Sequence, residues 1–492
     1  MATYLGIDVG TSAVKVILMG ESGEVLDSQS ESYGFDAPHP LWREQNPEIW
    51  WQGTQTAITK IRTRQSYAWS AVAAIGLSGQ MHGAVCLDEQ NKPVRPAILW
   101  NDGRAFKECE RLNQQLPHLG ESAGVPAMPG FTAPKLLWLK QFEPDVFSQI
   151  HTAILPKDYV RLKLTGELCT DVSDAAGTLW LNEQLRNWDE SVLAASGITL
   201  AQMPKLIEGN EISGTLTTET ALAFGLSVDT PVCGGGGDAA AGGVGIGAIN
   251  EGDAFVSLGT SGQLFVAKER YTANPKKLVH AFAHAIPDRW YQMACLLNGA
   301  SPLAWFASIC GQSVSDLLEE AEQHSTESSA EMFLPYLSGE RTPHNNPFAT
   351  GSFQGMTSTT ERHHMTQAIL EGIAYSLRDC LNALSEKGLP FHELGAIGGG
   401  ARSRYWLQMI ADVLEVPINQ YIGSESGPAL GAARLAKLSI KDGTPESTCI
   451  QPTVSQVFEP RREKSQYHLE KYQRFAEYYC QLYGAKNRHS ED

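Results

Sequence analysis

The sequence predicts an α/β protein of two related domains, and two observations support this prediction. The chain has 492 residues, which at about 150 residues per domain is enough for two large domains or about three smaller ones. A short internal repeat favours two, because residues 8–12 (DVGTS) align with residues 257–261 (SLGTS) about half a chain later. Since β-rich runs flank both copies, we expect domains at residues 1–247 and 248–492, each beginning with two strands joined by a Gly-Thr-Ser turn.

The first half begins as a meander of short antiparallel strands. Residues 4–9 and 14–19 are strand-like on either side of the Gly-Thr-Ser turn, and the polar turn 21–24 precedes another short strand-like run. Residues 74–79 predict a further strand that runs into a loop, and residues 88–93 predict a hairpin turn. Mixed helical and strand signals follow, which is typical of an α/β domain.

Local patterns in the second half predict helices, a strand and a linker. In order, we expect an amphipathic helix at 365–384, a strand at 393–397, a helix at 405–414, an Ala-rich helix at 431–438, a polar linker at 441–460 and a closing helix at 466–483. The strand enters the triple glycine Gly398-Gly399-Gly400, and the next helix leaves it.

The charge balance restricts the partners of the chain. Lys and Arg number 38 and Asp and Glu 55, so the formal net charge is −17. A chain this acidic has no general attraction for nucleic acid or anionic lipid. Any polyanion must therefore be held locally, by backbone N–H groups, helix N-termini, a metal or a few cations.

Cysteine usage and the N-terminus predict a cytoplasmic protein. The nine cysteines are scattered and contain no C-x-x-C pair, so we expect neither a disulfide framework nor a zinc site. The N-terminus lacks the basic region of a signal peptide, and the Gly/Ala-rich run 233–249 has too few large apolar residues for a membrane span. We expect no membrane partner and no nucleic-acid partner.

Glycine clusters of three kinds give the strongest chemical signal: the two Gly-Thr-Ser turns, a strand-to-helix junction and a run of four glycines. The turns at Thr11-Ser12 and Gly259-Thr260 expose backbone N–H groups and add hydroxyl donors, which suits a phosphate chain. A single copy is more simply an ordinary hairpin turn, but the strand-to-helix junction at Gly399-Gly400-Ala401 adds N–H groups and the positive end of a helix dipole. Lys15, four residues beyond Thr11, either reaches a phosphate or is an ordinary strand lysine. The sequence has no P-loop, G-x-G-x-x-G fingerprint or kinase H-R-D loop, so nucleotide binding would use another architecture.

The third cluster, residues 234–237, delivers one carboxylate, Asp238, to the start of a small-residue helix. Asp at a helix N-cap is common, but a cap needs no approach of four glycines. Glycine permits another backbone or a ligand to come close. Asp238 is therefore a candidate general base toward a substrate hydroxyl.

Three further positions have open alternatives. Asp8 ends a mostly apolar strand, so it either lies near Mg²⁺ or stabilises the turn. His82, between Met81 and Gly83 at a strand end, is either structural or functional. In the segment 100–104, Asp102 and Arg104 either hold sugar hydroxyls or pair with each other.

Seven segments together resemble the FGGY family of carbohydrate kinases. They are residues 8–12, 80–83, 100–104, 235–238, 257–262, 333–343 and 398–402. Their order and spacing cover the chain from residue 4 to about residue 440, and residues 130–138 and 351–371 are similar to the two signature segments of the family.

The resemblance implies two ribonuclease-H-like domains of the actin-like ATPase type, closing on a cleft that holds ATP, Mg²⁺ and a sugar. It implies that Asp238 is the catalytic base, that Met81 and His82 contact the sugar, and that Asp8 acts near the metal. The residues that would line the nucleotide are Thr11, Ser12, Lys15, Gly259, Thr260, Gly399, Gly400 and Ala401.

Within the family the chain is most similar to bacterial members that act on D-xylulose, which implies ATP-dependent formation of D-xylulose 5-phosphate. One position departs: Ala239 stands where such kinases usually have Asn after the catalytic aspartate. The alternatives are a kinase for L-xylulose, ribulose or glycerol, and an actin-like ATP switch that phosphorylates no sugar. A homodimer is one alternative for the oligomeric state.

Overall fold

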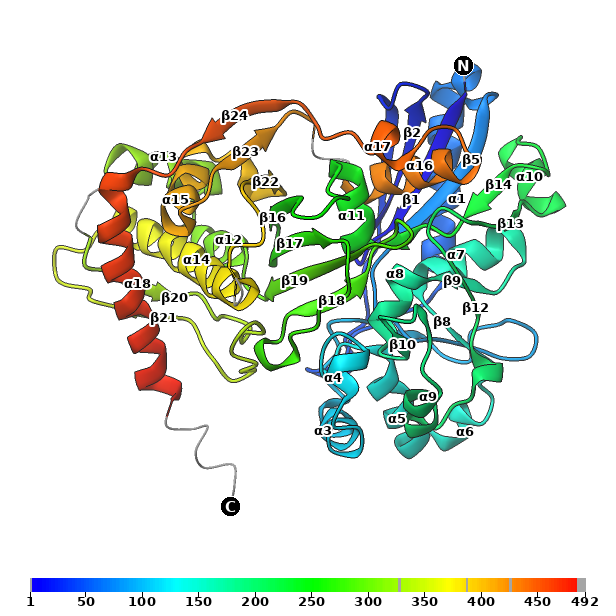
Figure 1. Ribbon diagram of the computed structural model, residues 1–492, viewed down its shortest axis with the longest axis horizontal. Helices are drawn as coiled ribbons and strands as arrows, with labels where there is room; N and C mark the ends of the chain where they lie inside the picture. The colour runs from blue at the N-terminus through cyan, green and yellow to red at the C-terminus, as the bar shows by residue number, and fades with distance from the viewer. Residues whose placement is uncertain (1, 326–328, 386–387, 424–426, 485–492) are drawn as a thin grey trace.

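The computed structural model describes residues 2–325, 329–385, 388–423 and 427–484, and its centre is formed by two seven-stranded sheets (Figure 1). The first sheet has the order β13-β14-β5-β1-β2-β3, with β15 paired to β5. Its strands are β1 (Thr3–Val9), β2 (Ala13–Gly20), β3 (Val25–Ser32), β5 (Val72–Gly79), β13 (Ile212–Thr215), β14 (Pro231–Cys233) and β15 (Gly236–Gly237). Strands β1, β2 and β3 form antiparallel pairs, so the predicted meander is confirmed.

The second sheet has the order β18-β19-β17-β16-β22-β23-β24. Its strands are β16 (Ala254–Leu258), β17 (Gly262–Lys268), β18 (His280–Ala283), β19 (Trp290–Leu296), β22 (Leu394–Ile397), β23 (Ile418–Tyr421) and β24 (Val454–Phe458). The central strand β1 is almost fully buried, and three of the five residues of its counterpart β16 are buried, as expected for strands covered on both faces.

The two sheets share one strand arrangement. In each, a Gly-Thr-Ser turn joins an antiparallel pair, β1–β2 or β16–β17, and the first strand of the pair has a parallel neighbour, β5 or β22. A second parallel strand follows, β14 or β23, and an antiparallel strand closes the edge, β13 or β24. The five-residue repeat in the sequence therefore marks a repeat of the whole sheet, which is the predicted two-part α/β fold.

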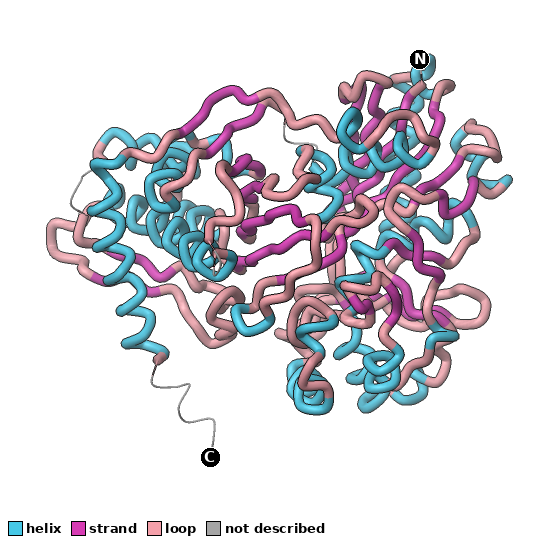
Figure 2. Tube along the Cα trace, viewed as in Figure 1, coloured by secondary structure: helices cyan, strands magenta, loops and turns pink. Residues whose placement is uncertain are grey.

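Helices cover the outer faces of both sheets (Figure 2). On the first sheet these are α1 (Glu48–Arg64) and α7 (Pro156–Thr165). On the second they include α12 (Ser301–Cys310), α13 (Val314–Gln323), α14 (Arg362–Leu384) and α15 (Arg404–Leu414), with α18 (Arg462–Tyr483) at the far edge of the molecule in Figure 1. The described helices include none with the length and apolar character needed to cross a bilayer.

Helix α16 (Gly427–Ser439) comes from the second half of the chain but packs on the first sheet. A Cβ at Gly6 of β1 would overlap with the Ala429 carbonyl, and a Cβ at Gly76 of β5 would overlap with that of Ala432. The glycines therefore permit the helix backbone to lie directly on the strands. The predicted domain boundary between residues 247 and 248 stays a prediction. Helix α16 lies after this boundary in the sequence but packs on the sheet formed before it.

Helix α11 (Asp238–Ile246) lies between α16 and the second sheet (Figure 1). A Cβ at Gly431 of α16 would overlap with Ala241 of α11, and a Cβ at Gly243 would stand 3.0 Å from the Phe265 ring of β17. The order of layers is thus first sheet, α16, α11, second sheet. This stack fixes the first residue of α11, Asp238, at the junction of the two halves.

The remaining elements surround these layers. In the first half they are β4 (Glu44–Gln45), α2 (Ser66–Trp69), β6 (Val85–Leu87), β7 (Ala97–Ile98), α3 (Phe106–Gln115), α4 (Leu119–Ser122), α5 (Thr132–Phe142), α6 (Pro144–Phe147), β8 (Thr152–Ile154), β9 (Cys169–Asp171), α8 (Val172–Ala175), η1 (Ala176–Thr178), β10 (Leu181–Asn182), β11 (Asn187–Trp188), α9 (Glu190–Ser196), η2 (Leu200–Gln202), β12 (Lys205–Ile207) and α10 (Thr218–Phe224). In the second half they are η3 (Pro275–Lys277), β20 (Met332–Leu334), β21 (Ser352–Gln354), η4 (Gly399–Arg402) and α17 (Pro445–Thr448).

The helices predicted from local pattern are confirmed. The predictions at 365–384, 405–414, 431–438 and 466–483 correspond to α14, α15, α16 and α18, and the strand at 393–397 corresponds to β22. The linker predicted at 441–460 is wrong, because it contains α17 and the strand β24, which pairs antiparallel with β23. Strand β24 is a polar edge strand that is mostly exposed, so it lacks the apolar alternation that marks a buried strand.

Candidate active site

Two carboxylates define the centre of the site. Asp8 lies near the end of β1, beside Ser78 of the parallel strand β5. Burial raises the pKa of Asp8 to about 6, and the Ser78 hydroxyl and the Lys15 charge oppose this shift. Lys15 is the residue of β2 directly opposite Asp8. The structure therefore brings the two candidates together, while phosphate binding by Lys15 stays a prediction.

Asp238 is the first residue of α11, and the residue at its N-cap is Gly237. The side chain therefore does not take the position of the helix cap that the sequence left as an alternative. It is accessible to solvent, although protein atoms of both halves surround it. This enclosure and the like charge of Asp8 raise the pKa of Asp238 to about 7, opposed by the Ala239 N–H, which donates to Oδ1 at 2.8 Å. Because the Asp8 charge contributes to the raised pKa of Asp238, we refer to the two carboxylates as the acidic pair.

The four glycines before Asp238 are required by close packing. A Cβ at Gly235, whose φ is 74°, would overlap with the Leu77 carbonyl of β5. A Cβ at Gly237 would stand 2.9 Å from Cγ of Met81. The loop thus passes directly over the end of β5, and this places Asp238 beside the Met81-His82 turn.

His82 is held neutral and in one orientation. Its Nδ1 lies 2.8 Å from the Gly177 carbonyl, so Nδ1 carries the proton and Nε2 keeps its lone pair for a ligand. Burial lowers the pKa of His82 to about 3, although the bond to Gly177 opposes the shift. The ring packs on Phe131 at 4.4 Å between centroids. His82 is therefore suited to accept a hydrogen bond from a hydroxyl at neutral pH.

The hydroxyl of Thr11 is already bonded within the first turn. It donates to Gln80 Oε1 at 2.9 Å and accepts from Trp100 Nε1 at 2.9 Å. Ser12 is exposed at the tip of the turn. Of the donors expected here, the Ser12 side chain and the backbone N–H groups are better placed for a ligand than the Thr11 hydroxyl.

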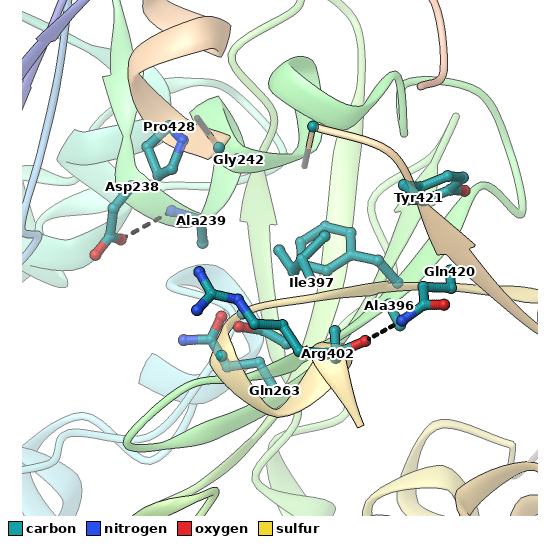
Figure 3. A pocket seen from close by; sticks show the side chains of 17 residues that line it. Asp238, Ala239, Gly242, Gln263, Ala396, Ile397, Arg402, Gln420, Tyr421 and Pro428 are labelled. Atoms are coloured by element: carbon teal, nitrogen blue, oxygen red, sulfur yellow. Dashed lines mark hydrogen bonds between the residues drawn. The ribbon is translucent and has the colours of Figure 1, made fainter. Parts of the chain in front are cut away.

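A pocket of about 480 Å³ extends from Asp238 into the second half (Figure 3). Figure 3 shows Asp238 and Ala239 at one side, Gln420 and Tyr421 at the other, and the Arg402 side chain between them. Of the predicted nucleotide residues, Gly399 and Ala401 line this pocket.

A larger hollow of about 1550 Å³ adjoins this pocket. Among the predicted residues, Gly259, Thr260, Gly399 and Gly400 line it. Because Gly399 and Arg402 border both spaces, a nucleotide in the larger hollow can extend its phosphates toward Asp238. Close packing restricts two of the three glycines: a Cβ at Gly398 would stand 2.8 Å from the Leu258 carbonyl carbon, and a Cβ at Gly400 would stand 2.8 Å from Leu258 Cβ.

Two residues that line the pocket, Gln263 and Arg402, were not predicted from the sequence. Gln263 lies opposite Ser257 in the β16–β17 pair, and both side chains line the pocket of Asp238. Strand alternation from the Gly-Thr-Ser turn could have found Gln263, and the position of Arg402 directly after Gly-Gly-Gly-Ala is the signal for the arginine.

For segment 100–104 the structure favours pairing. The Arg104 guanidinium lies 2.7 Å from Asp102, and both side chains are buried. Arg104 also packs over the Trp42 ring at 4.0 Å. The segment therefore has a structural role, and Trp100 within it donates to the Thr11 hydroxyl of the first turn.

The acidic pair fits a divalent metal of the kind that accompanies a nucleotide triphosphate. Asp8 Oδ1 is buried and has no hydrogen-bond partner among the described residues. Mg²⁺ usually takes one or two protein carboxylates and completes its shell with waters and substrate phosphates. The described residues include no cluster of three or more His, Cys, Asp or Glu side chains that could hold a metal ion.

Comparisons with known proteins match this geometry over almost the whole chain. The model of the FGGY family of carbohydrate kinases, N-terminal domain, matches residues 3–245, and that of the C-terminal domain matches residues 254–440. A xylulose kinase of Escherichia coli K12 is 46% identical over 96% of both chains, and one of Klebsiella pneumoniae is 43% identical over 97% of this chain and 99% of its own. A solved kinase structure from Brucella ovis superposes with a TM-score of 0.94 at 42% identity, over 98% of this chain and 100% of the other.

Proposed function

We propose that this chain, which belongs to the FGGY family of carbohydrate kinases, transfers the γ-phosphoryl group of ATP to the 5-hydroxyl of D-xylulose. The products are D-xylulose 5-phosphate and ADP. The support for D-xylulose is the similarity to xylulose kinases over nearly the full chain. This similarity is the reason for proposing D-xylulose as the acceptor in place of another ketose or glycerol.

The observation that carries the chemistry is Asp238 at the junction of the two halves. It lies in the pocket that leads to the triple glycine, beside the Met81-His82 turn, with its pKa raised to about 7 by enclosure and by Asp8. A general base works best when its pKa is near the working pH. An actin-like switch that phosphorylates no sugar would need no such base.

In the reaction, Asp238 accepts a hydrogen bond from the 5-hydroxyl and takes its proton as the oxygen bonds to the γ-phosphorus. The bond between the γ-phosphorus and the bridging oxygen breaks, and its electron pair leaves with ADP. Mg²⁺, when bound, neutralises phosphate charge. Asp8 would hold it, with its unpaired Oδ1, and Asp238 remains free to act as the base.

His82 and Met81 orient the sugar in this proposal. The neutral His82 accepts a hydrogen bond from a sugar hydroxyl at Nε2, because Gly177 fixes its tautomer. Met81 is 4% exposed and packs against Gly237, so it forms an apolar wall behind the reacting end. Correct alignment of hydroxyl and phosphorus supplies much of the rate enhancement in phosphoryl transfer.

The nucleotide is assigned to the larger hollow and its opening toward Asp238. In this assignment backbone N–H groups at Ser12, Thr260 and Gly400 bind the phosphates, and Lys15 balances charge near Asp8. The residues supporting it are those of the second turn and the triple glycine that line the hollow, namely Gly259, Thr260, Gly399 and Gly400. Thr11, Ser12 and Lys15 of the first turn are not among the lining residues of either space, so their part in nucleotide binding rests on the repeat of the turn. A cytoplasmic location and a homodimer also remain proposals, and light scattering tests the latter.

A coupled assay of ADP release tests the function. The panel contains D-xylulose, L-xylulose, ribulose and glycerol, with ATP alone as the baseline. We expect the highest kcat/KM on D-xylulose. A preference of about tenfold for another acceptor, about 1.4 kcal/mol of transition-state binding, would reassign the sugar. ADP release that no acceptor stimulates would support the switch instead.

A further inference from the structure

An aromatic ring of the first half lies between two histidines that belong to different halves. Phe131 packs on His82 at 4.4 Å between centroids and stacks on His280 at 6.1 Å with an interplanar angle of 15°. His280 is the first residue of β18 in the second sheet. The second half therefore reaches the residues that orient the sugar in the proposed function.

His280 has an unsatisfied polar atom in this position. Its side chain is almost fully buried, at 1% exposure, and Nε2 has no hydrogen-bond partner among the described residues. Its Nδ1 lies 3.9 Å from Cys295 Sγ. Buried polar atoms without a partner are uncommon and are often explained by a ligand or a water. This orphan atom points to a polar ligand close to the Phe131 ring.

Arg341 brings a positive charge to the same place from the second half. The loop that carries it is anchored by the Glu340 carboxylate, whose Oε1 accepts from the Leu297 N–H at 2.9 Å and the Arg341 N–H at 2.7 Å. Arg341 Nη2 lies 4.0 Å from the position that a Cβ of Gly130 would occupy, directly before Phe131. The guanidinium therefore reaches across to the first half.

The electrostatic environment of Cys295 includes both Arg341 and the proposed base Asp238. Burial raises the pKa of the Cys295 thiol to about 11, the nearby Arg341 lowers it, and the charge of Asp238 raises it. Cys295 thus lies within electrostatic range of both groups, whereas the charge that most affects Asp238 is that of Asp8. Arg341 reaches Gly130, and the ring of the next residue, Phe131, packs on His82, so Arg341 adjoins the residues that orient the sugar in the proposed function.

We propose that Arg341 binds the carbonyl end of an open-chain ketose, with donors to the C2 carbonyl oxygen and the C1 hydroxyl oxygen. This rests on the proposed function, which puts the C5 hydroxyl at Asp238 and so directs the other end of the extended sugar toward Arg341. Guanidinium offers several N–H donors in one plane. A carbonyl oxygen only accepts, whereas the alcohol at C2 of a polyol also carries a hydrogen that must find an acceptor.

In this assignment, residues of both halves of the molecule bind the sugar. His82 and Phe131 come from the first half, and Arg341 and His280 come from the second. A ketose bound at both ends therefore draws the halves together before the phosphoryl group moves. A polyol of the same length lacks the carbonyl contact and gains less from closure.

The test compares D-xylulose with xylitol and D-arabinitol, the two alcohols formed by reducing its C2 carbonyl. For wild type, Arg341→Gln and Arg341→Lys, we would measure sugar binding by calorimetry and kcat and KM by ADP release. Arg378→Gln is the matched control, because Arg378 lies on α14 and bonds to Val413 and Glu415 at the surface. Thermal unfolding verifies that each variant is folded.

In Arg341→Gln we expect the affinity for D-xylulose to fall about 10- to 100-fold, mainly through KM, as for a lost hydrogen bond to a charged group. The polyols should change less than about threefold, and KM for ATP should stay within about twofold. Arg341→Lys keeps the charge but not the planar donor set, so it should lose about three- to tenfold. If Arg341→Gln does not fold, the lysine variant decides by itself.

Equal losses on ketose and polyol, or an unchanged affinity for D-xylulose, would overturn the assignment. Failure of the proposed function is a separate result, namely no turnover of D-xylulose by the wild type. In that case calorimetry on another ketose and its own reduced alcohol still decides the role of Arg341. If Arg341→Gln loses affinity for the ketose but not for its alcohol, the role of Arg341 is supported. An equal loss of affinity for both refutes it.

Discussion

The two Gly-Thr-Ser hairpins have the same backbone plan but different charge. In the first, Asp8 faces Lys15 across the β1–β2 pair; in the second, Ser257 faces Gln263 across β16–β17. The turns themselves are alike in sequence. The repeat has therefore kept the part that exposes N–H groups and changed the side chains beside it. In the proposed function, metal binding therefore belongs to the first hairpin, and the uncharged second hairpin contributes a surface for the nucleotide.

The largest expected effect comes from replacing Asp238, the proposed base. Asp238→Asn keeps the size of the side chain but not the proton acceptor, so kcat should fall about 10²- to 10⁴-fold. Nucleotide affinity should persist, because the residues assigned to it lie mostly in the second half. Steady-state kinetics and ADP calorimetry measure the two effects. Turnover within a few-fold of wild type would show that Asp238 is structural.

A paired substitution of the two hairpins sharpens the comparison. Asp8→Asn should lower kcat about 10²-fold and raise the Mg²⁺ concentration needed for half-maximal rate, because the negative charge on the carboxylate with the unpaired oxygen is lost. Ser257→Ala, at the equivalent position, should change both by less than about twofold. Mg²⁺ titrations of the two variants give the answer. Equal effects would mean that the hairpins share the metal.

The pH profile tests the acidic pair. As the proposed base, Asp238 would act only when it is deprotonated, and burial with the Asp8 charge raises its pKa to about 7. The value of kcat/KM should therefore fall about tenfold per pH unit below this point and level off above it. In Asp8→Asn the like charge is gone, so the pKa of Asp238 falls and the acid limb moves to lower pH. A flat profile between about pH 5 and 8 would contradict the assignment of the base.

The turns also differ in how they tolerate a side chain. A Cβ at Gly259 would meet only the Ser261 carbonyl oxygen at 3.5 Å, whereas a Cβ at Gly10 would stand 2.9 Å from that of Ala13. Gly259→Val should therefore keep the fold and weaken ADP binding about tenfold, by blocking approach of phosphate. Gly10→Val should also lower Tm. Calorimetry and thermal unfolding separate these outcomes, and an unchanged ADP affinity in Gly259→Val would remove that turn from the site.

The smallest expected effect concerns Ala239, which lines the pocket beside Asp238. An amide there would gain one hydrogen bond to a ketose hydroxyl, a net ~0.5–1.5 kcal/mol. Ala239→Asn should improve kcat/KM for D-xylulose a few-fold, mainly through KM. A loss on D-xylulose would instead indicate a pocket shaped for another sugar, and kinetics on the acceptor panel would identify it.

Local signals predicted much of this molecule, and distant contacts account for what was missed. The turn at Thr11, the glycines before Asp238 and the helix α14 each have a signature within a few residues. Arg341 lies in a segment that resembles the family, but no local pattern indicates a sugar contact there, because the proposed contact arises only where the second half meets the first. The strand β24 was missed for a related reason: its pairing with β23, and not its own pattern, makes it a strand.

The placement of α16 has a consequence for how the protein is made. Its residues 427–439 cover β1, which contains Gly6, so β1 leaves the ribosome long before the helix that covers it. A first half synthesised alone would expose the glycine-containing face of its sheet to water and to other chains. We expect such a fragment to aggregate, and to be recovered when a fragment containing residues 248–492 is produced with it. Folding during translation is therefore completed late, and this stage is where dependence on chaperones should be greatest.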